Sequence, residues 1–334
     1  MSKIQRLLIV KTSSMGDVIH MLPAITDIKR VHPEIQIDWA VEEGFAHIPA
    51  WHPFVNKVIP VAVRRWRKRL FCPSTWKQVR TFKKQLSQAQ YDLVIDSQGL
   101  FKSAVISSWA QQPVAGMDKH SARESIASRF YQNKYPVARG QHAVPRNRQL
   151  VAQVLDYDLE TLPLDYGLAD KALIDSDSLD LELPERFAIF LHAASTPEKE
   201  WSVTQWVSLG KKLNKRGLSV LLPWGDSREH NNANSIANEL KQAVVLPRLG
   251  LSDLAKLFLR AELLVGEDSG LSHMAAALDR PIVALYLVTD PALTGMMASE
   301  VSKNNRVINC QVKNEEQDVI KVADILDTWI PTAD

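Results

Sequence analysis

Short apolar runs alternate with amphipathic helical stretches along the whole chain. In the first half, apolar runs of strand length occupy residues 7–11, 35–41, 57–63 and 91–96, and the last helical stretch covers residues 143–155. Short apolar runs bounded by polar turns predict buried strands, and the stretches between them have the period of helices. The first half therefore predicts strands separated by helices.

The same alternation continues in the second half. Apolar runs at residues 187–192, 218–223, 243–246, 263–267 and 281–287 predict strands, again with helical segments between them. Alternation of this kind implies parallel sheets covered by helices, so the predicted fold class is α/β.

The pattern fades over residues 156–184, where Asp, Leu and Ser dominate. Since 334 residues exceed a comfortable single core, we expect two domains, residues 1–165 and 166–334, joined through this stretch. It contains Asp156-Tyr157-Asp158 and Asp175-Ser176-Asp177, which resemble metal-binding carboxylate pairs. Neither pair follows an apolar strand or has a third ligand at suitable spacing, so a solvated acidic connector is favoured over a metal site.

The turn after residues 263–267 has the composition of an anion site. Asp268, Ser269 and Gly270 lead into a small-residue helix whose first turn carries His273. Unpaired amides at a helix start attract anions, and Gly270 leaves room for a phosphate to approach the backbone. Asp268 and His273 add directional polar groups. The alternative is structural: Asp268 or Ser269 caps the helix and His273 packs inside the protein.

A second turn of similar form follows residues 7–11. Thr12-Ser13-Ser14-Met15-Gly16-Asp17 leads directly into a helical pattern. Ligands of open parallel sheets collect at the carboxyl ends of strands, so both turns are candidate parts of a ligand site. Asp17 fits a helix cap as well as a ligand-facing carboxylate, and one side chain can serve both roles.

Charge is nearly balanced overall but uneven along the chain. The net charge is +2, with 46% hydrophobic and 23% charged residues, which is typical of a globular protein and disfavours nucleic acid as a partner. Residues 64–84 contain nine Lys or Arg and no Asp or Glu, so this segment is either a plain exposed face or a surface for an anionic partner. Trp66, Leu70 and Phe71 lie in it and suit the headgroup layer of an anionic membrane.

Cysteine spacing and hydropathy predict a reducing compartment. Cys72 and Cys310 match neither a disulfide framework nor a metal site. Lys11 interrupts the first apolar run after four residues, so this run is too short for a signal sequence. No apolar stretch approaches the ~20 residues needed to span a bilayer. We therefore expect a cytoplasmic protein with, at most, peripheral membrane contact.

Common nucleotide-binding and hydrolase motifs are missing from the sequence. It contains no Gly-x-Gly-x-x-Gly, no glycine-rich loop ending in Gly-Lys-Ser/Thr and no Gly-x-Ser-x-Gly. Hydride transfer, phosphoryl transfer and ester hydrolysis are therefore disfavoured. The remaining interpretation is a protein that binds a nucleotide ligand in one half and a reacting partner in the other.

Several of these motifs together resemble the ADP-heptose:lipopolysaccharide heptosyltransferase family. The resemblance extends from the first strand to beyond Pro291, and it is carried by residues 11–20 (KTSSMGDVIH), 41–45 (VEEGF), 64–68 (RRWRK), 96–99 (DSQG), 122–124 (ARE), 222–225 (LPWG) and 268–273 (DSGLSH). It implies a GT-B glycosyltransferase with two Rossmann-like domains facing a central cleft. The N-terminal domain would bind the acceptor and the C-terminal domain the sugar nucleotide.

The resemblance also implies a reaction and a base. Heptose would move from ADP-heptose to the first Kdo of Kdo2-lipid A, with inversion and with no cofactor or metal. Asp17 would be the general base, in agreement with the need to deprotonate an acceptor hydroxyl as it attacks. A related enzyme acting on a later inner-core sugar, and a non-catalytic receptor for a nucleotide or anionic glycolipid, remain alternatives.

Further residue roles follow from the same resemblance. The donor would be bound by Ser195, Lys199, Glu229, Asp268, Ser269, Gly270 and His273. Acceptor anions would be bound by Ser13, Ser14, Arg64, Arg65, Arg67, Lys68 and Arg123, and the guanidinium fork suits carboxylates and phosphates. The enzyme would then work peripherally on the cytoplasmic face of the inner membrane. Taken alone, Lys199 would be an ordinary surface lysine and Glu229 a solvated helix-start glutamate.

The chain departs from the family pattern at two places. Leu287 and Val288 stand where a glycine and a proline are expected, which changes the backbone freedom of a loop beside the donor. Ala194 stands where a hydroxyl residue is expected, with Ser195 adjacent.

Overall fold

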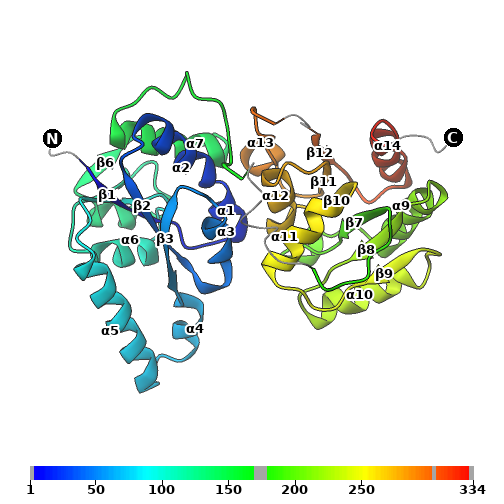
Figure 1. Cartoon of the computed structure of the whole chain (residues 1–334), viewed down its shortest axis with the longest axis horizontal. Helices are drawn as coiled ribbons and strands as arrows, with labels where there is room; N and C mark the ends of the chain where they lie inside the picture. Colours follow the sequence, from blue (N-terminus) through cyan, green and yellow to red (C-terminus); the bar gives the residue numbers. More distant parts are fainter. Residues whose placement is uncertain (1–3, 169–178, 303–305, 331–334) are drawn as a thin grey trace. The chain divides into compact units, whose positions relative to one another are not determined.

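The computed structural model describes residues 4–168, 179–302 and 306–330. The chain divides into two compact units, Met1–Leu168 (unit 1) and Ala169–Asp334 (unit 2), each built around its own sheet (Figure 1). The expected linker over residues 156–184 is described only in part, and Asp175-Ser176-Asp177 lies outside the described residues.

Unit 1 contains a six-stranded parallel sheet with the order β3-β2-β1-β4-β5-β6. This order places the carboxyl ends of β1 and β4 side by side where the strand order reverses, which is the position where such sheets bind ligands. The strands are β1 (Arg6–Val10), β2 (Gln36–Glu42), β3 (Val55–Val61), β4 (Leu93–Asp96), β5 (Val114–Met117) and β6 (Asn133–Tyr135).

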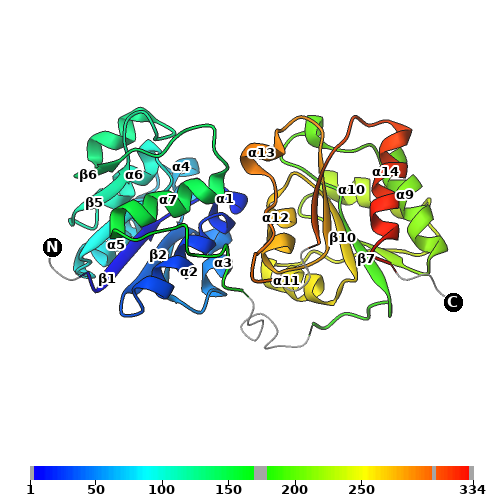
Figure 2. The ribbon, with the colours of Figure 1, turned by 90° about the horizontal axis from the view of Figure 1, so that it is seen from above.

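Helices cover both faces of this sheet (Figure 2). α2 and α7 lie on one face, and α5 and α6 lie on the other, where Phe82 and Leu86 pack against Leu8, Val10 and Val94. The helices are α1 (Met15–Ile19), α2 (Leu22–Val31), η1 (Glu43–Phe45), α3 (His47–Ala50), α4 (Val63–Lys68), α5 (Pro73–Gln88), α6 (Phe101–Ser108), η2 (Ser125–Phe130) and α7 (Ala143–Leu155).

Unit 2 has a second six-stranded parallel sheet, with the order β12-β11-β10-β7-β8-β9. Here the order reverses between β7 and β10, so the carboxyl ends of these two strands form the expected ligand edge. The strands are β7 (Phe187–Leu191), β8 (Ser219–Leu222), β9 (Ala243–Val245), β10 (Leu263–Glu267), β11 (Ile282–Tyr286) and β12 (Val307–Gln311).

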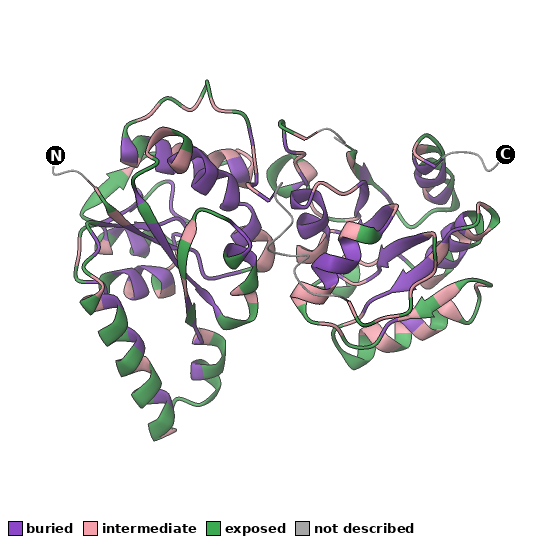
Figure 3. Ribbon diagram, viewed as in Figure 1, coloured by how far each residue is buried: buried purple, intermediate pink, exposed green. Residues whose placement is uncertain are grey.

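Four helices of unit 2, α9, α10, α12 and α13, start at side-chain caps. Ser202 accepts the Gln205 N–H at the start of α9, and Trp206 then packs against Phe190 of β7. The central strands of both sheets are buried, whereas the edge strands are partly exposed and the outward helix faces are exposed (Figure 3). The helices are η3 (Pro197–Lys199), α9 (Val203–Lys215), α10 (Ser227–Ala237), α11 (Leu251–Arg260), α12 (Gly270–Ala277), α13 (Pro291–Thr294) and α14 (Glu316–Asp327).

All nine strands predicted from the apolar runs are confirmed within two residues, as is the helix over residues 143–155. Three strands, β5, β6 and β12, were not predicted. β5 contains Gly116, where a Cβ would lie 2.5 Å from the Tyr131 ring, so packing requires a residue that interrupts the apolar run. β6 and β12 are edge strands with polar residues, which weaken the apolar signal.

Candidate functional site

The turn after β1 presents Asp17 in an ionised form. Its Oδ2 accepts hydrogen bonds from the Ser14 backbone N–H (2.8 Å) and the Ser14 hydroxyl (3.0 Å). Burial opposes ionisation, but the Lys11 ammonium, these two hydrogen bonds and Arg123 outweigh it and lower the pKa of Asp17. Asp17 therefore lies in the first turn of α1 and remains partly exposed, with 28% of its side chain accessible. It can cap the helix and still accept a proton from a ligand.

Lys11 lies buried beneath this turn. Its ammonium donates to the Ser97 carbonyl (3.0 Å) and to Asn147 Oδ1 (3.5 Å). Burial lowers the pKa of Lys11, while Asp17 and Asp96 act in the opposite direction. The residue that interrupts the first apolar run is thus an internal cation at the end of β1.

The segment after β4 fixes the other side of this site. Gln98 Oε1 accepts from the backbone N–H and the hydroxyl of Thr12, both at 2.7 Å, which joins the β1 and β4 turns. Gly99 has φ +66°, and a Cβ there would lie 3.2 Å from the Arg123 backbone nitrogen. Glycine therefore lets the Arg123 segment approach, and Arg123 Nη1 comes to 4.0 Å from Asp17 Oδ2.

Lys102 belongs to this cluster and was not predicted from the sequence. Its ammonium donates to the Ser13 hydroxyl at 3.0 Å. Burial, together with Arg64, Arg67 and Arg123, lowers the pKa of Lys102, although Glu42 opposes the shift. A lysine early in a helix looks like a surface residue in the sequence. Only its place after the β4 turn could have suggested otherwise.

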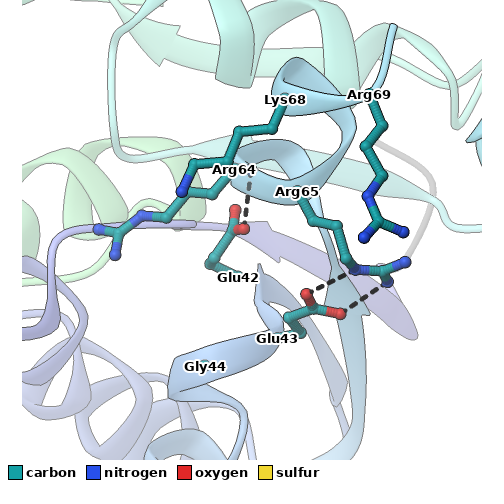
Figure 4. Close-up of a pocket in the computed structure, with 7 residues that line it drawn as sticks. All are labelled: Glu42, Glu43, Gly44, Arg64, Arg65, Lys68 and Arg69. Carbon is teal, nitrogen blue, oxygen red and sulfur yellow. Dashed lines mark hydrogen bonds and ion pairs between the residues drawn. The ribbon is translucent and has the colours of Figure 1, made fainter. Parts of the chain in front are cut away.

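The basic segment, residues 64–84, begins in α4 and continues into α5. Its first part forms one wall of a pocket of about 400 Å³ (Figure 4). The Arg64 backbone N–H donates to Glu42 Oε1 (2.9 Å), and its guanidinium lies over the Phe45 ring (5.0 Å). Arg64 and Lys68 extend to one side of α4, away from Arg65 and Arg69. The pocket is lined by Glu42, Glu43, Gly44, Arg64, Arg65, Lys68 and Arg69.

Arg65 differs from its neighbours because its guanidinium group already binds side chains of the protein. Nε and Nη2 bind the two Glu43 oxygens at 3.0 and 2.9 Å, and Nη1 binds Gln78 Oε1 at 2.8 Å. The hydrogen bonds from Arg65 lower the pKa of Glu43, whereas burial raises the pKa of Glu42. Arg65 therefore holds α4 against η1, while the side chains of Arg64, Arg67 and Lys68 are exposed.

Apolar side chains project from the same segment. Phe71 is fully exposed at 101%, Leu70 at 50% and Trp76 at 52%. Trp66 instead packs inside against Phe82 at 5.8 Å. Of the aromatic and aliphatic residues that the sequence placed at a membrane surface, Leu70 and Phe71 are available and Trp66 is not.

In unit 2, Asp268 follows β10 and forms an ion pair with the Lys199 ammonium. Its Oδ2 accepts hydrogen bonds from Lys199 Nζ and from the Thr289 hydroxyl, both at 2.7 Å. Ser269, not Asp268, caps α12 by accepting the Ser272 N–H. His273 lies in the first turn of α12 and is 6% exposed. Asp268 is therefore a ligand-edge carboxylate, and Thr289, in the loop with the Leu287-Val288 departure, is a second partner that the sequence did not indicate.

The loop after β7 carries Ser195 and Lys199. Ser195 is exposed, and Lys199 ends η3, a turn held by the bonds from Lys199 N–H to the Thr196 carbonyl and from Glu200 N–H to the Pro197 carbonyl. Because β7 and β10 are neighbours in the sheet, Lys199 meets Asp268 from the adjacent strand end. Lys199 is thus held in an ion pair, unlike an ordinary surface lysine.

Glu229 lies in the first turn of α10. Asp226 caps this helix by accepting the Glu229 N–H (2.9 Å), and Glu229 Oε2 accepts the Gly225 N–H (2.6 Å). Glu229 therefore stabilises the turn after Pro223-Trp224. The next residue, His230, packs against Trp224 with ring centroids 4.4 Å apart.

In the described part of the acidic connector, the Asp156-Tyr157-Asp158 pair makes local contacts, and Asp165 pairs with Arg30 at 2.6 Å. Asp156 ends α7 with φ +55°, and Asp158 Oδ1 accepts the Glu160 N–H. Across residues 4–168, 179–302 and 306–330, no three His, Cys, Asp or Glu side chains are grouped to hold a metal ion. No helix in these ranges is both long and apolar enough to cross a membrane.

The predicted residues thus gather in two groups. In unit 1, Asp17, Ser13, Ser14 and Arg123 surround one turn, and Lys102 connects them electrostatically to Arg64 and Arg67. In unit 2, Lys199 and Asp268 are in contact, Ser269 and Gly270 start α12, and Glu229 lies in the first turn of α10, which follows β8.

The chain is similar to known glycosyltransferases. Residues 79–324 match the model of Glycosyltransferase family 9 (heptosyltransferase). The Lipopolysaccharide heptosyltransferase 1 of Pseudomonas aeruginosa is 51% identical, over 87% of this chain and 81% of that protein. The structure of E. coli heptosyltransferase WaaC with ADP matches with a TM-score of 0.86 and 40% identity, over 97% of this chain and 99% of that one.

A second structure, E. coli heptosyltransferase WaaC with ADP-2-deoxy-2-fluoro heptose, matches with a TM-score of 0.82 and 40% identity, covering 97% of this chain and 98% of that one. These matches confirm the expected α/β fold of GT-B type with two Rossmann-like sheets.

Proposed function

The chain belongs to glycosyltransferase family 9, the heptosyltransferases, and from this premise we propose that it transfers L-glycero-D-manno-heptose from ADP-heptose to the first Kdo of Kdo2-lipid A. The donor is supported by the solved relative bound to an ADP-heptose analogue. The acceptor is supported by the name of the relatives and by the exposed cations of unit 1.

The observation that carries the proposal is the state of Asp17. It is an ionised, partly exposed carboxylate at the carboxyl end of a central strand, with exposed Arg123 4.0 Å away. A base that deprotonates a sugar hydroxyl must be charged before the reaction and reachable by the substrate, and Asp17 meets both requirements. Arg123 and Lys102 supply positive charge for an anionic acceptor beside that base.

The proposed step is a single displacement. The acceptor hydroxyl gives its proton to Asp17 as its oxygen forms a bond to the anomeric carbon. The bond from that carbon to the diphosphate oxygen breaks, and ADP leaves with the electron pair, so the anomeric configuration inverts. Lys199 and the amides at the start of α12 stabilise the charge that grows on the diphosphate.

The remaining predicted residues divide between the two substrates. Ser195, Ser269 and Gly270 bind the diphosphate, Asp268 and His273 orient the heptose or the diphosphate, and Glu229 turns from the Gly225 amide to the ribose hydroxyls. For the acceptor, Arg64, Arg67 and Lys68 bind Kdo carboxylates or lipid A phosphates, and Ser13 and Ser14 adjoin the reacting hydroxyl. Arg65 contributes by holding α4 in place, since its fork is bound to Glu43.

We also propose that the enzyme works peripherally on the cytoplasmic face of the inner membrane, where a lipid-anchored acceptor resides. Leu70 and Phe71 project from a segment with nine cations and no acidic residue between positions 64 and 84. Apolar side chains among cations suit an anionic bilayer surface.

Purified protein incubated with ADP-heptose and Kdo2-lipid A tests the function directly. ADP release that depends on the acceptor, together with one heptose added to the acceptor mass, is expected. Transfer only to an acceptor that already carries heptose would show a later step of the inner core. Donor binding without acceptor-dependent release would show a receptor and end the proposal.

A further inference from the structure

A buried carboxyl group lies directly beneath the loop that carries Lys199. Glu267 is the last residue of β10, is 0% exposed, and precedes Asp268. Its Oε1 accepts the Trp201 backbone N–H at 2.6 Å. Its other oxygen, Oε2, is buried, and the Trp206 indole is the further polar group that faces the carboxyl. A buried carboxyl is costly, so its short contact with the Trp201 amide needs an explanation.

Two contacts join Glu267, the last residue of β10, and Asp268, which follows it, to one short loop. Lys199 Nζ binds Asp268, and two residues later the Trp201 N–H binds Glu267. Between them, the η3 bonds from Lys199 N–H and Glu200 N–H make the loop one tight turn. A shift of the backbone at Trp201 is therefore transmitted to Lys199.

Other contacts hold the residues on either side of Trp201, including Asn314, which donates to the Glu200 carbonyl (3.4 Å) and accepts the Ser202 N–H (3.0 Å). Glu267 is the contact that ties the Trp201 amide itself to β10. The Trp201 ring is buried in the core, in edge contact with Trp206 at 5.3 Å. The Glu200 carboxylate accepts the Ala194 N–H (3.2 Å) and binds Arg228 of α10 at 2.6 Å. Neither contact provides an acceptor for the buried Trp201 N–H, which only Glu267 supplies among the described residues.

We propose that Glu267 is a positioning residue for the donor: by accepting the Trp201 N–H it sets the height of η3 and so aims Lys199 at the diphosphate of the nucleotide sugar. The inference rests on the proposed function for the identity of that ligand. Its physical content is that Glu267 acts through Lys199 and not through contact with substrate.

The neutral form of Glu267 suits this role. Burial raises the pKa of Glu267 to about 8, although the Trp201 hydrogen bond lowers it. A protonated Glu267 accepts the amide hydrogen bond without adding negative charge beneath a diphosphate site. Glutamine should therefore replace it, because the amide oxygen can accept the same bond, whereas leucine fills the space and cannot.

The test is a double-mutant cycle read by calorimetric binding of ADP. We expect Glu267→Leu to weaken ADP binding about five- to tenfold and Lys199→Met to weaken it about tenfold or more. If Glu267 acts through Lys199, the double variant binds ADP within about twofold of Lys199→Met alone. Glu267→Gln is expected to bind within about twofold of the unchanged protein.

The matched control is Glu262→Leu at the other end of β10, where the carboxylate pairs with Arg186 at 2.7 Å. Its melting temperature should fall while its ADP affinity stays unchanged, which separates positioning from loss of stability. Should Glu267→Leu not fold, Glu267→Asp, whose side chain is one methylene too short to reach the Trp201 N–H, takes its place with the same expected direction.

Effects that multiply in the double variant, or unchanged ADP binding in both Glu267→Leu and Glu267→Asp, would overturn the inference and leave the proposed function standing. Because ADP binding needs no acceptor, failure of heptose transfer does not obscure this result. An unchanged protein that does not bind ADP at all would remove the proposed function and this inference together.

Discussion

Lys199 Nζ and Asp268 Oδ2 lie 2.7 Å apart, in a pair that joins the loop after β7 to the turn after β10. Both side chains are mostly buried, with 23% and 11% of their surfaces exposed. The Thr289 hydroxyl donates to the same oxygen, so Asp268 is held from two directions. The lysine that would meet a diphosphate is thus oriented before the ligand arrives, which lowers the cost of ordering a long side chain on binding.

Replacing Lys199 by Met should remove this charge while keeping most of the aliphatic stem. We expect kcat/KM for ADP-heptose to fall about 10²-fold or more, because loss of one donor to a developing oxyanion costs about that much. The measurement is ADP release at saturating acceptor. Lys211→Met is the control, since Lys211 is an exposed lysine paired with Glu239 at 3.8 Å. Equal rates for Lys199→Met and the control would refute the role of Lys199.

Asp17→Asn should strongly reduce turnover and leave the affinity for the donor nucleotide unchanged. A positioned general base contributes about 10²- to 10⁴-fold, and we expect kcat to fall by this amount while ADP affinity stays within about twofold. Asp92→Asn is a matched control, because Asp92 Oδ2 also accepts two hydrogen bonds, from the Gln5 and Arg6 N–H groups, at 2.8 Å. A tenfold or greater loss of ADP affinity in Asp17→Asn would move this residue to the donor side.

The pH profile follows from the sign of the Asp17 shift. Since its pKa lies below the ordinary value of 3.8, Asp17 stays ionised as the pH falls from 8 to 5. We therefore expect kcat/KM for the acceptor to show no acidic limb from this group in that range. A limb near pH 6 that disappears in Asp17→Asn would contradict the lowered pKa.

The sequence was sufficient for the two turns because their signal is local. An apolar strand followed by a hydroxyl, a carboxylate and a glycine predicts a ligand edge, and both Asp17 and Asp268 were found in this way. The pairing of Asp268 with Lys199 could not be read locally, because it depends on β7 and β10 being neighbours in the sheet. Only the resemblance to a known family assigned Lys199 to the donor.

Lys102 and Glu267 show what a local pattern misses. Lys102 looks like a solvated residue of a helix start, and it becomes part of the site because β4 lies beside β1. Glu267 looks like a polar strand end, and it is buried because η3 folds over it. Arg65 shows the opposite case, since it shares a basic run with its neighbours but its fork is taken by Glu43.

The exposed cations of α4 should determine the KM for the acceptor and not the KM for the donor. Charge-assisted hydrogen bonds contribute about 1.5–3 kcal/mol each, so the double variant Arg64→Ala with Arg67→Ala should raise the acceptor KM at least about tenfold. The donor KM should stay nearly constant. Lys83→Ala with Lys84→Ala removes the same charge from α5 and serves as control. Equal changes in both KM values would reject this division of labour.

Membrane contact should depend on the apolar tip of the basic segment. Full burial of a Leu or Phe side chain contributes about 1.5–3 kcal/mol, so Leu70→Ser with Phe71→Ser should weaken binding to phosphatidylglycerol vesicles about tenfold or more. Binding is measured by sedimentation, in low and high salt, against phosphatidylcholine vesicles. Ile320→Ser, at an apolar residue of α14 that is 48% exposed, is the control. Equal binding of the two variants would exclude the tip as a contact.

The raised pKa of Glu267 makes a prediction about stability that does not depend on activity. Unfolded, this carboxyl should titrate near 4.5, and folded it titrates near 8, so between these values the folded protein holds one proton more. Its contribution to the unfolding free energy is complete below pH 4.5 and is lost as the pH rises, by about 1.4 kcal/mol per pH unit at most. The charged neighbours Glu200 and Arg228 remain in both proteins compared, so Glu267→Gln isolates this group. We expect the two melting temperatures to agree near pH 4.5 and the unchanged protein to melt further and further below the variant as the pH rises to 8. A constant difference across this range would mean that Glu267 is already ionised when buried.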